Sequence, residues 1–249
     1  MSVYAASDWH GCYWVWEKVK EILKPEDKLY FLGDAADRGH DGWRMIKELL
    51  ADPRVIYIEG NHEDLMVKAI GNYKPKKDID YFWDRRMENW FYNGAEPTFT
   101  AFCGDKNEEE KIKILSKIKT LPFCANYVNQ KGFNIFMCHA GCDGQEIDDL
   151  DYNNAIWDRN HFIIPDTWYG DDNTIVIHGH TPIEYVIKEQ QTHTDYFNRK
   201  NIECIMPEYN GGTYWYAKGH KGCIDMGTVW NNIAILLNLD TLEDIIIKK

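Results

Sequence analysis

Short apolar segments of this sequence are repeatedly followed at once by aspartate, asparagine or histidine, and this pattern constrains the fold more than any other. In the clearest case, residues 29–32 are apolar enough to form a buried strand, and Gly33 and Asp34 follow directly. Because ligands bind outside the carboxyl ends of strands in open α/β sheets, a strand that delivers a carboxylate there is a common way to build a site. A single Gly-Asp pair is usually only a turn, so the functional interpretation depends on repetition.

Four further strand-like segments are each followed by such residues. These combinations are 3–6 with Asp8 and His10, 55–58 with Asn61, 134–138 with His139, and 174–177 with His180. Helical patterns at residues 13–23 and 42–50, and from about residue 65, separate the first strands and predict an α/β fold. Since Asp8 and His10 are two residues apart, an extended strand end would point both side chains to one face.

The alternation of strands and helices breaks down in two regions. Residues 72–102 carry aromatic clusters at 81–83 and 90–92, and they predict a small helical insert over about residues 72–120 whose aromatics mostly pack within it. Residues 189–222 are polar and glycine-rich, and their pattern assigns no element. Closing strands are predicted beyond them, at residues 223–226, 233–239 and 241–247.

Composition excludes several functional classes. The 249 residues are 44% hydrophobic, which suffices for one core, so we expect a single domain over residues 1–249. The net charge of −12 argues against binding to nucleic-acid backbones and suits a site that attracts divalent cations. The seven cysteines form no C-x-x-C pair, which favours reduced thiols. With no signal-peptide pattern and no apolar run of membrane-spanning length, a cytoplasmic location is expected.

The polar residues at the five strand ends are of the types that bind divalent metals. Two aspartates, one asparagine and three histidines are too many for one ion that must keep an open position. We therefore expect two ions that share one carboxylate, and Asp34, on the strand predicted to be central, is the candidate for the shared ligand. Two ions roughly 3.5–4 Å apart lower the pKa of a bridging water and clamp the oxygens of an in-line displacement at phosphorus. The predicted chemistry is phosphoester hydrolysis.

Other polar residues near these ends have candidate roles in such a hydrolysis. Consecutive residues of an extended chain point apart, so His62 beside Asn61 is expected to protonate the leaving alkoxide rather than to bind metal. Asp37 can hold the other ring nitrogen and keep His62 cationic. Arg38 and Arg159 can each bind phosphate oxygens through two N–H groups. The alternative for Asp37 and Arg38 is a local pair on the surface.

In their order, these motifs resemble those of the calcineurin-like metallophosphoesterases and, more narrowly, the bacterial and phage phosphoprotein phosphatases. The matching motifs are Asp8-Trp9-His10-Gly11, Gly33-Asp34-Ala35-Ala36-Asp37-Arg38-Gly39, Gly60-Asn61-His62-Glu63, His139-Ala140-Gly141 and Gly179-His180-Thr181. The resemblance implies a sandwich of two mixed β-sheets flanked by helices. It also implies two divalent metals, with manganese the first choice and iron, zinc or nickel as alternatives.

The resemblance further implies roles for single residues. One metal would be held by Asp8, His10 and Asp34, and the other by Asp34, Asn61, His139 and His180. His62 would be the general acid, Asp37 its partner, and Arg38 and Arg159 the phosphate clamps. Five positions depart from the family pattern. Ala36 replaces a valine, Trp9 a smaller aliphatic residue, Ala95 a glycine and Pro182 a histidine of broader members, and His178 is an additional histidine. His178 is expected to support the site from behind the ligands, and a further direct contact in the site is the alternative.

The leading functional prediction is a protein serine/threonine phosphatase of bacterial type. The closest alternative is a hydrolase of dinucleoside polyphosphates, which shares these motifs, so the expected partner is a phosphorylated protein or a small phosphoester. A non-catalytic scaffold on the same fold is the third possibility, and it is disfavoured because all six ligand positions and His62 are intact. The substrate, the native metal and the oligomeric state stay open from the sequence.

Overall fold

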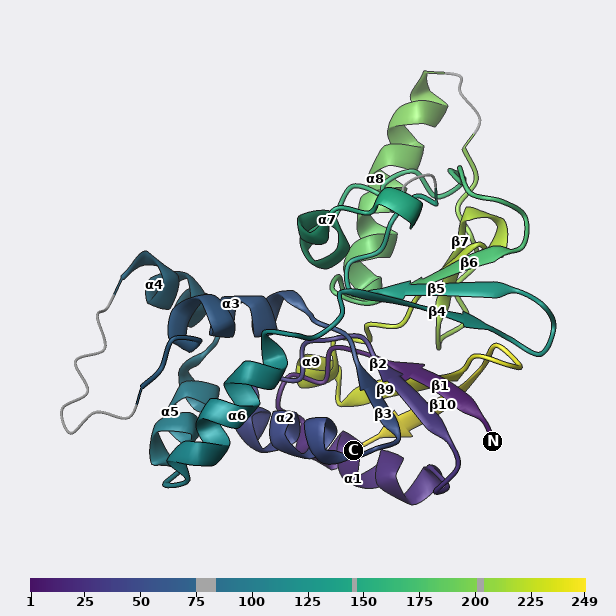
Figure 1. Cartoon of the computed structure of the whole chain (residues 1–249). Helices are drawn as coiled ribbons and strands as arrows, with labels where there is room; N and C mark the ends of the chain where they lie inside the picture. Colours follow the sequence, from purple (N-terminus) through teal and green to yellow (C-terminus); the bar gives the residue numbers. More distant parts are fainter. Residues whose placement is uncertain (75–83, 145–146, 201–203) are drawn as a thin grey trace.

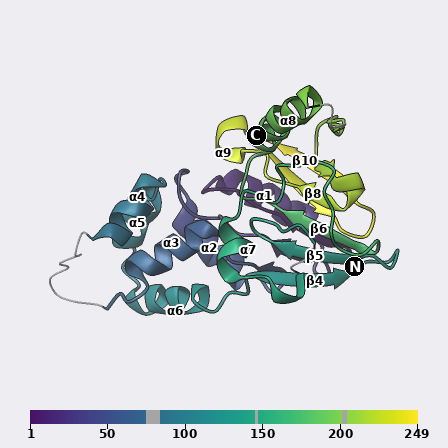
Figure 2. The same cartoon turned by 90° about the horizontal axis from the view of Figure 1, so that it is seen from above.

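The computed structural model describes residues 1–74, 84–144, 147–200 and 204–249. Within them, two mixed five-stranded β-sheets pack against each other, and helices lie outside them (Figure 1 and Figure 2). The predicted α/β sandwich of two mixed sheets flanked by helices is confirmed. None of the described helices combines the length and the apolar composition that crossing a membrane requires.

The first sheet has the strand order β10-β9-β1-β2-β3. Its strands are β1 (Val3–Ala6), β2 (Lys28–Phe31), β3 (Val55–Tyr57), β9 (Ile233–Asn238) and β10 (Glu243–Lys248). Strands β1, β2 and β3 are parallel, because helices α1 (Tyr13–Ile22) and α2 (Gly42–Ala51) return the chain to the starting edge. Since Ala6 pairs with Phe31 and Phe31 with Tyr57, the three carboxyl ends are level.

The second sheet has the strand order β4-β5-β6-β8-β7. Its strands are β4 (Cys124–Val128), β5 (Asn134–Cys138), β6 (Thr174–His178), β7 (Tyr214–Tyr216) and β8 (Lys221–Cys223). Strands β5, β6 and β8 are parallel, so their carboxyl ends also share one edge. The helices of this half are α7 (Tyr152–Trp157), α8 (Ile183–Arg199) and α9 (Thr228–Asn231), with 3₁₀ turns η1 (Ile147–Asp149) and η2 (Ala217–Gly219).

The core between the sheets explains why β1 is a continuous apolar run. Val3 and Ala5 belong to the cluster that includes Ile135 of the second sheet, whereas Tyr4 and Ala6 belong to the cluster on the helix side. Successive side chains of a strand point to opposite faces, so a strand covered on both sides needs an apolar residue at every position. Polar residues first appear after the end of β1, where the chain is no longer packed on both faces.

Among the described residues, four helices lie between β3 and β4. They are α3 (Asn61–Ile70), α4 (Arg85–Tyr92), α5 (Glu96–Gly104) and α6 (Glu108–Ile118). The side chains of Asp84 and Asn107 cap α4 and α6 by accepting hydrogen bonds from backbone N–H groups of the first turn. Trp90 is fully buried and packs edge-on against Phe99, whereas Tyr92 is 91% exposed. The predicted aromatic cluster at residues 81–83 lies outside the described residues.

Two predicted boundaries are wrong. Helix α3 begins at Asn61 rather than near residue 65, because the Glu63 carboxylate accepts a hydrogen bond from the Gly60 N–H group (3.1 Å) and closes the first turn. The strand expected at residues 223–226 ends at Cys223, since β8 spans Lys221–Cys223. Beyond it the chain turns toward α9.

Residues 189–222, which have no assignment from the sequence, contain the second half of α8 and strand β7. The buried face of α8 consists of Ile183, Val186, Gln190 and Thr194, so the spacing is helical but half of the positions are polar. Gln190 donates a hydrogen bond from Nε2 to the Phe162 carbonyl oxygen (2.8 Å). Hydrogen bonds therefore replace part of the apolar stripe that a sequence pattern would reveal. Residues 201–203 lie outside the described residues.

Candidate active site

Hydrogen bonds tie together the ends of strands from both sheets. After β1, the Asp8 N–H group donates to the Gly33 carbonyl oxygen at 3.1 Å. Between the sheets, His139 Nδ1 donates to the Leu32 carbonyl oxygen (2.6 Å) and the His180 N–H group donates to Asp8 Oδ2 (3.0 Å). The carboxyl ends of β1, β2, β5 and β6 therefore meet at one place in the molecule.

The backbone at these strand ends is left-handed rather than extended. Asp8, His10, Asp34 and His180 have φ angles of 57°, 41°, 61° and 65°. The premise that Asp8 and His10 follow each other on an extended chain is therefore wrong, although His10 Nε2 and Asp8 Oδ1 lie only 4.0 Å apart. A non-glycine residue in the left-handed conformation costs about 1–3 kcal/mol of folding free energy, and such residues cluster at functional sites.

Two glycines let the carboxylates approach the backbone closely. A Cβ atom at Gly60 would overlap Oδ1 of Asp34, and a Cβ atom at Gly179 would overlap Oδ2 of Asp8. The glycine that precedes the polar residue in each of these two motifs is therefore required by packing. Any side chain there would push an aspartate out of the site.

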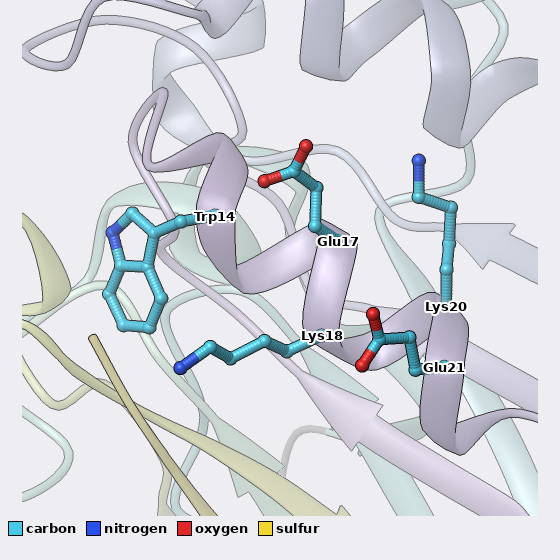
Figure 3. Close-up of a pocket in the computed structure, with 5 residues that line it drawn as sticks. All are labelled: Trp14, Glu17, Lys18, Lys20 and Glu21. Carbon is cyan, nitrogen blue, oxygen red and sulfur yellow. The ribbon is translucent and has the colours of Figure 1, made fainter.

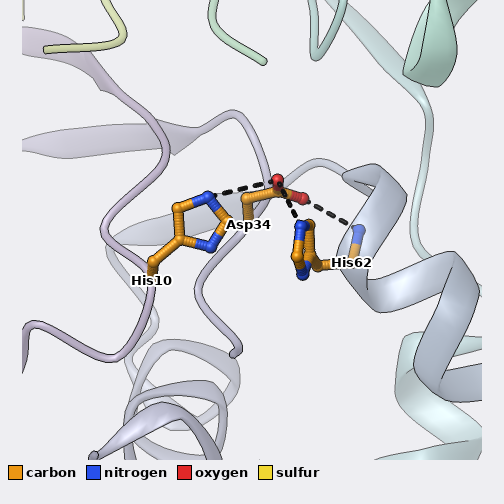
Figure 4. Close-up of side chains that lie close together, drawn as sticks. All are labelled: His10, Asp34 and His62. Atoms are coloured by element: carbon orange, nitrogen blue, oxygen red, sulfur yellow. Dashed lines mark hydrogen bonds and ion pairs between the residues drawn. The ribbon is translucent and has the colours of Figure 1, made fainter. Parts of the chain in front are cut away.

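Asp34 lies at the centre and faces ligand-type atoms on two sides. Its Oδ2 atom lies 3.6 Å from His10 Nε2 and 3.8 Å from His62 Nε2 (Figure 4). Its Oδ1 atom lies 3.5 Å from His139 Nε2. Burial favours the neutral acid, but the positive potential of His139 and His62 outweighs it and holds the pKa of Asp34 well below its usual range. One ionised carboxylate thus presents an oxygen to each of two histidine clusters.

The second cluster is completed by Asn61 and His180. The Asn61 Oδ1 atom lies 3.0 Å from His139 Nε2 and 2.8 Å from His180 Nδ1, and the two imidazole nitrogens are 3.2 Å apart. Burial lowers the pKa of His139, but Asp34 opposes it strongly and the pKa rises to about 10. Burial and the charge on His139 together lower the pKa of His180 well below its ordinary value. The carboxylate of Asp34 therefore favours positive charge at His139, which is the kind of charge that a bound cation would supply.

The residues at this site fit a pair of divalent metal ions. Two sets of buried ligand atoms each lie within 4.8 Å of one another: His10, Asp34 and His62 form one, and Asp34, His139 and His180 the other. Oδ1 of Asp8 is buried and has no hydrogen-bond partner among the described residues. Leaving such an atom unpaired costs about 1–3 kcal/mol or more, and a cation would satisfy it. The donor set of imidazole and carboxylate suits zinc, manganese, iron and nickel alike.

His62 and Asp37 form a buried pair beside Asp34. His62 Nδ1 donates to Asp37 Oδ2 at 2.7 Å, and Trp90 Nε1 donates to the same oxygen at 2.8 Å. Burial lowers the pKa of His62, but the carboxylates of Asp34 and Asp37 outweigh it and raise the pKa above the usual value. Asn61 and His62 open α3 rather than an extended chain, so the reason given above for excluding His62 as a ligand does not hold. The pair leaves Nε2 of His62 facing Asp34.

Both predicted phosphate clamps reach the imidazoles of the site. Arg38 donates from Nη1 to His10 Nε2 (2.6 Å), and its Nη2 atom lies 3.0 Å from His62 Nε2. Arg159 donates from Nε to His180 Nε2 at 3.1 Å. Each guanidinium group therefore contacts a different cluster, Arg38 the first and Arg159 the second. Arg38 and the buried Asp37 point to different partners and do not form the surface pair considered as the alternative.

Glu63 is a structural support that the sequence interpretation missed. Its carboxylate accepts hydrogen bonds from the N–H groups of Asp34 (2.8 Å) and Ala35 (3.0 Å) and from the Tyr57 hydroxyl (2.9 Å). The residue is fully buried, and burial followed by repulsion from Asp34 raises its pKa. A glutamate at the third position of a helix after a glycine is a capping signal, so the sequence did contain the clue.

The extra histidine lies behind the ligands. His178 Nδ1 donates to the Gly179 carbonyl oxygen (3.1 Å), and its Nε2 accepts from the Tyr216 hydroxyl (2.8 Å). His161 Nε2 donates to the Ala140 carbonyl oxygen (2.7 Å), and its Nδ1 lies 3.4 Å from the same hydroxyl. His178, which is buried, and His161, which is partly buried, thus hold the backbone next to His139 and His180. Neither His161 nor Tyr216 belongs to a motif that the sequence analysis singled out.

The pocket on the surface of α1 lies apart from these residues. It is lined by Trp14 and by four charged side chains of the same helix (Figure 3). None of the residues predicted for the site lines it. Neighbouring lysines and glutamates on one face of a helix are typical of solvated surface, so the pocket gives no sign of a functional site.

Comparison with known proteins agrees with this geometry. Residues 1–221 match the family model of the calcineurin-like phosphoesterases. The chain is similar to the symmetrical bis(5'-nucleosyl)-tetraphosphatase of Buchnera aphidicola subsp. Schizaphis graminum (strain Sg), with 34% identity over 89 residues. That alignment covers 33% of this chain and 32% of the relative, so the chain spans about a third of the relative's length.

Solved structures share the fold at low sequence identity. One, described provisionally as a diadenosine tetraphosphatase, has a TM-score of 0.59 and 14% identity, with 98% of this chain and 92% of that chain covered. A protein serine/threonine phosphatase from Saccharomyces cerevisiae has a TM-score of 0.51 and 12% identity, with 100% and 80% covered. The match of the family model over residues 1–221 decides the assignment. The chain therefore belongs to the calcineurin-like phosphoesterase family.

Proposed function

We propose that this chain hydrolyses phosphoesters with two divalent metal ions bound at the converging strand ends. The observation that carries the proposal is the position of Asp34, which presents Oδ2 to His10 and Oδ1 to His139. We propose Asp8, His10 and Asp34 as the ligands of one of these ions. When bound, such ions supply an activated water nucleophile and neutralise charge on the phosphoryl group. Manganese is our first choice, with iron, zinc and nickel as alternatives.

The second ion would be held by residues from four separate elements. We propose Asp34, Asn61, His139 and His180 for this role, since their ligand atoms already lie together within the second cluster. His62 has a nitrogen near the first cluster, but its Nδ1 bond to Asp37 supports another role. We propose the role of ligand to the first ion for Asp8, whose buried Oδ1 lacks a hydrogen-bond partner among the described residues.

The remaining polar residues would bind the phosphoryl group and move a proton. Arg38 lies next to the first cluster and Arg159 next to the second, so their N–H groups can hold phosphoryl oxygens while the bond breaks. His62 has one N–H group fixed on Asp37 and a raised pKa, so its Nε2 can carry the proton that the leaving oxygen needs. Trp90 and Asp37 together fix the orientation of the ring.

Our first candidate for the substrate is a dinucleoside polyphosphate. The support is the 34% identity to a symmetrical bis(5'-nucleosyl)-tetraphosphatase, although the alignment covers 33% of this chain. The second candidate, which was the leading prediction from the sequence, is a phosphoserine or phosphothreonine protein. The buried pair of His62 and Asp37 favours it, because a serine alkoxide needs a general acid far more than a phosphate leaving group does.

We also propose a cytoplasmic location. All seven cysteines are free thiols, and a reducing compartment keeps them so.

Product analysis separates the two substrates. The purified chain is incubated with diadenosine tetraphosphate or with a phosphoserine peptide, with and without manganese, and the products are resolved by chromatography. The first candidate predicts manganese-dependent formation of ADP alone from diadenosine tetraphosphate. Release of phosphate from the peptide with an intact tetraphosphate would favour the second. Failure to hydrolyse either compound or p-nitrophenyl phosphate with manganese, iron, zinc or nickel would reject the hydrolase and support the scaffold.

A further inference from the structure

Trp230 is a large aromatic residue that the proposed chemistry does not use. It lies on α9 and its side chain is 59% exposed, whereas Thr228 is the buried residue of that helix. Single exposed apolar residues are common and need no explanation by themselves. This one is distinguished by its neighbour, because the guanidinium carbon of Arg38 lies 5.2 Å from the centre of the Trp230 ring. That distance is within the range of a cation–π contact.

Arg38 links the ring to the proposed phosphate site. Its two terminal nitrogens lie next to His10 Nε2 and His62 Nε2, while its guanidinium carbon lies beside Trp230. The backbone holds the arginine there at a left-handed φ of 62°, with its N–H group donating to the Gly94 carbonyl oxygen (2.9 Å). The indole is therefore next to the group that would hold phosphoryl oxygens, and it leaves much of its own surface open to a ligand.

Short contacts fix the helix that carries the indole. The Gly227 N–H group donates to Asp225 Oδ1 (2.8 Å), and the Trp230 N–H group donates to the Gly227 carbonyl oxygen (2.9 Å). Asn231 Nδ2 donates to the Met226 carbonyl oxygen at 2.8 Å. Helix α9 also lies beside the start of α8 (Figure 2). There the Ile183 N–H group donates to the carbonyl oxygen of Asp225, which precedes α9. A platform held in this way binds a flat ligand without first having to be ordered.

We propose that Trp230 stacks on the nucleobase of a nucleotide whose phosphate is held by Arg38. The inference rests on the proposed function, because it names the part of the substrate beyond the phosphates. A nucleoside polyphosphate carries a planar aromatic group within reach of its anionic end, and an indole beside a guanidinium offers a partner for each part. Stacking of a base on an aromatic side chain is tolerant of base identity, so adenine serves as the probe.

Inhibition of p-nitrophenyl phosphate hydrolysis by ADP and by inorganic pyrophosphate tests the proposal. Both inhibitors carry a diphosphate, and only ADP carries a base. Loss of one base-stacking contact weakens binding roughly 5- to 150-fold, so we expect Trp230→Leu to raise the Ki of ADP about tenfold more than that of pyrophosphate. Trp230→Phe, which keeps an aromatic ring, should restore most of the preference. Tyr196→Leu, at an exposed aromatic near the far end of α8, is the matched control and should alter neither Ki.

Three results would overturn the proposal. Equal weakening of ADP and pyrophosphate would mean that Trp230 only positions Arg38. A wild-type protein that ADP does not inhibit would have no base site. The third result uses a phosphopeptide that carries an aromatic residue beside the phosphoserine as the inhibitor. If Trp230→Leu raises the Ki of this peptide but not that of ADP, the indole binds a peptide and not a nucleobase. The proposed function is judged separately, by hydrolysis of diadenosine tetraphosphate in the wild type, so either idea can fail while the other stands.

Discussion

His62 donates from Nδ1 to Asp37 Oδ2 at 2.7 Å, and both side chains are fully buried. The bond fixes which nitrogen of the imidazole faces Asp34, and the carboxylate raises the pKa of the ring against the effect of burial. A histidine held in this way is suited to giving a proton rather than to binding a metal. The distinction can be measured, because the need for a proton depends on the leaving group.

The first prediction concerns His62→Asn. Loss of a general acid costs about 10²–10⁴ in rate when the leaving group is an alkoxide, and far less when it is a nitrophenolate that departs readily without a proton. We therefore expect kcat to fall much more for a phosphoserine peptide or an alkyl phosphate than for p-nitrophenyl phosphate. Metal content, measured by elemental analysis, should match the wild type. Equal losses on both substrates, together with loss of one metal, would make His62 a ligand.

The second prediction concerns Asp8→Asn. Because Oδ1 of Asp8 is buried without a hydrogen-bond partner, the carboxylate destabilises the protein stripped of metal. An unpaired buried group costs about 1–3 kcal/mol, so the variant should be more stable than the wild type in a chelator by an amount of this order. With excess manganese the wild type should become the more stable of the two proteins. Its carboxylate binds the metal and gains binding free energy, which the amide of the variant does not. Thermal unfolding with and without chelator measures both.

An exposed aspartate provides the control for that experiment. Asp172→Asn removes the same charge at a surface position and should change neither unfolding temperature by more than a degree or so. If Asp8→Asn behaves like Asp172→Asn under both conditions, Asp8 does not bind metal and its burial has another explanation.

Much of the candidate site could be predicted from sequence because each motif is local. The chain must place a ligand directly after a buried strand, so Asp34 and His139 stand next to apolar runs that are visible without a structure. The supports of those ligands come from distant segments instead. Tyr216 belongs to a three-residue strand within a polar region, and its hydroxyl contacts His161 and His178, 55 and 38 residues away. No spacing rule links such residues.

The left-handed backbone was unpredictable for a similar reason. Aspartate tolerates this conformation better than most residues, but nothing in the sequence around Asp8 or Asp34 requires it. It arises because tertiary hydrogen bonds, such as that from the His10 N–H group to the Asp34 carbonyl oxygen (2.9 Å), hold both turns against each other. The closing strands were predicted within a few residues, since β9 and β10 follow plain apolar runs.

The third prediction concerns pH and a contact far from the strand ends. Asp105 accepts hydrogen bonds from Lys47 Nζ and Trp43 Nε1, both at 2.8 Å. Partial burial opposes ionisation, but these bonds and the lysine charge outweigh it and lower the pKa of Asp105 to about 2. The carboxylate therefore contributes stability above the unfolded pKa of 3.8, and this contribution is lost as the pH falls through the folded pKa of about 2.

Asp105→Asn should reveal that contribution. After allowance for solvent screening, we expect a loss of about 1 kcal/mol in the free energy of unfolding at pH 7. The difference from the wild type should shrink as the pH falls from about 4 toward 2. Glu109→Gln, on the exposed side of α6, should have little effect at either pH. A difference between Asp105→Asn and wild type that stays constant down to pH 2 would show that packing, rather than charge, is responsible.

The last prediction concerns the support behind His139 and His180. His178 and His161 each donate one N–H group to a backbone carbonyl oxygen, so their other nitrogens are acceptors that share the single proton of the Tyr216 hydroxyl. Tyr216→Phe removes that donor inside the protein and should lower stability by about 1–3 kcal/mol. Residues that orient metal ligands typically alter metal affinity about 10- to 100-fold, so we also expect faster loss of one metal to a chelator.

A matched substitution separates this effect from simple destabilisation. Tyr127 donates its hydroxyl to Asp240 Oδ1 at 2.7 Å, so Tyr127→Phe also loses a tyrosine hydrogen bond, and it involves no residue of the proposed site. We expect both variants to unfold at lower temperature, but only Tyr216→Phe should lose metal faster, and saturating manganese should restore most of its kcat. Equal rates of metal loss in the two variants would reduce the network around His178 to a contribution to packing, because the positions of His139 and His180 would then be fixed without it.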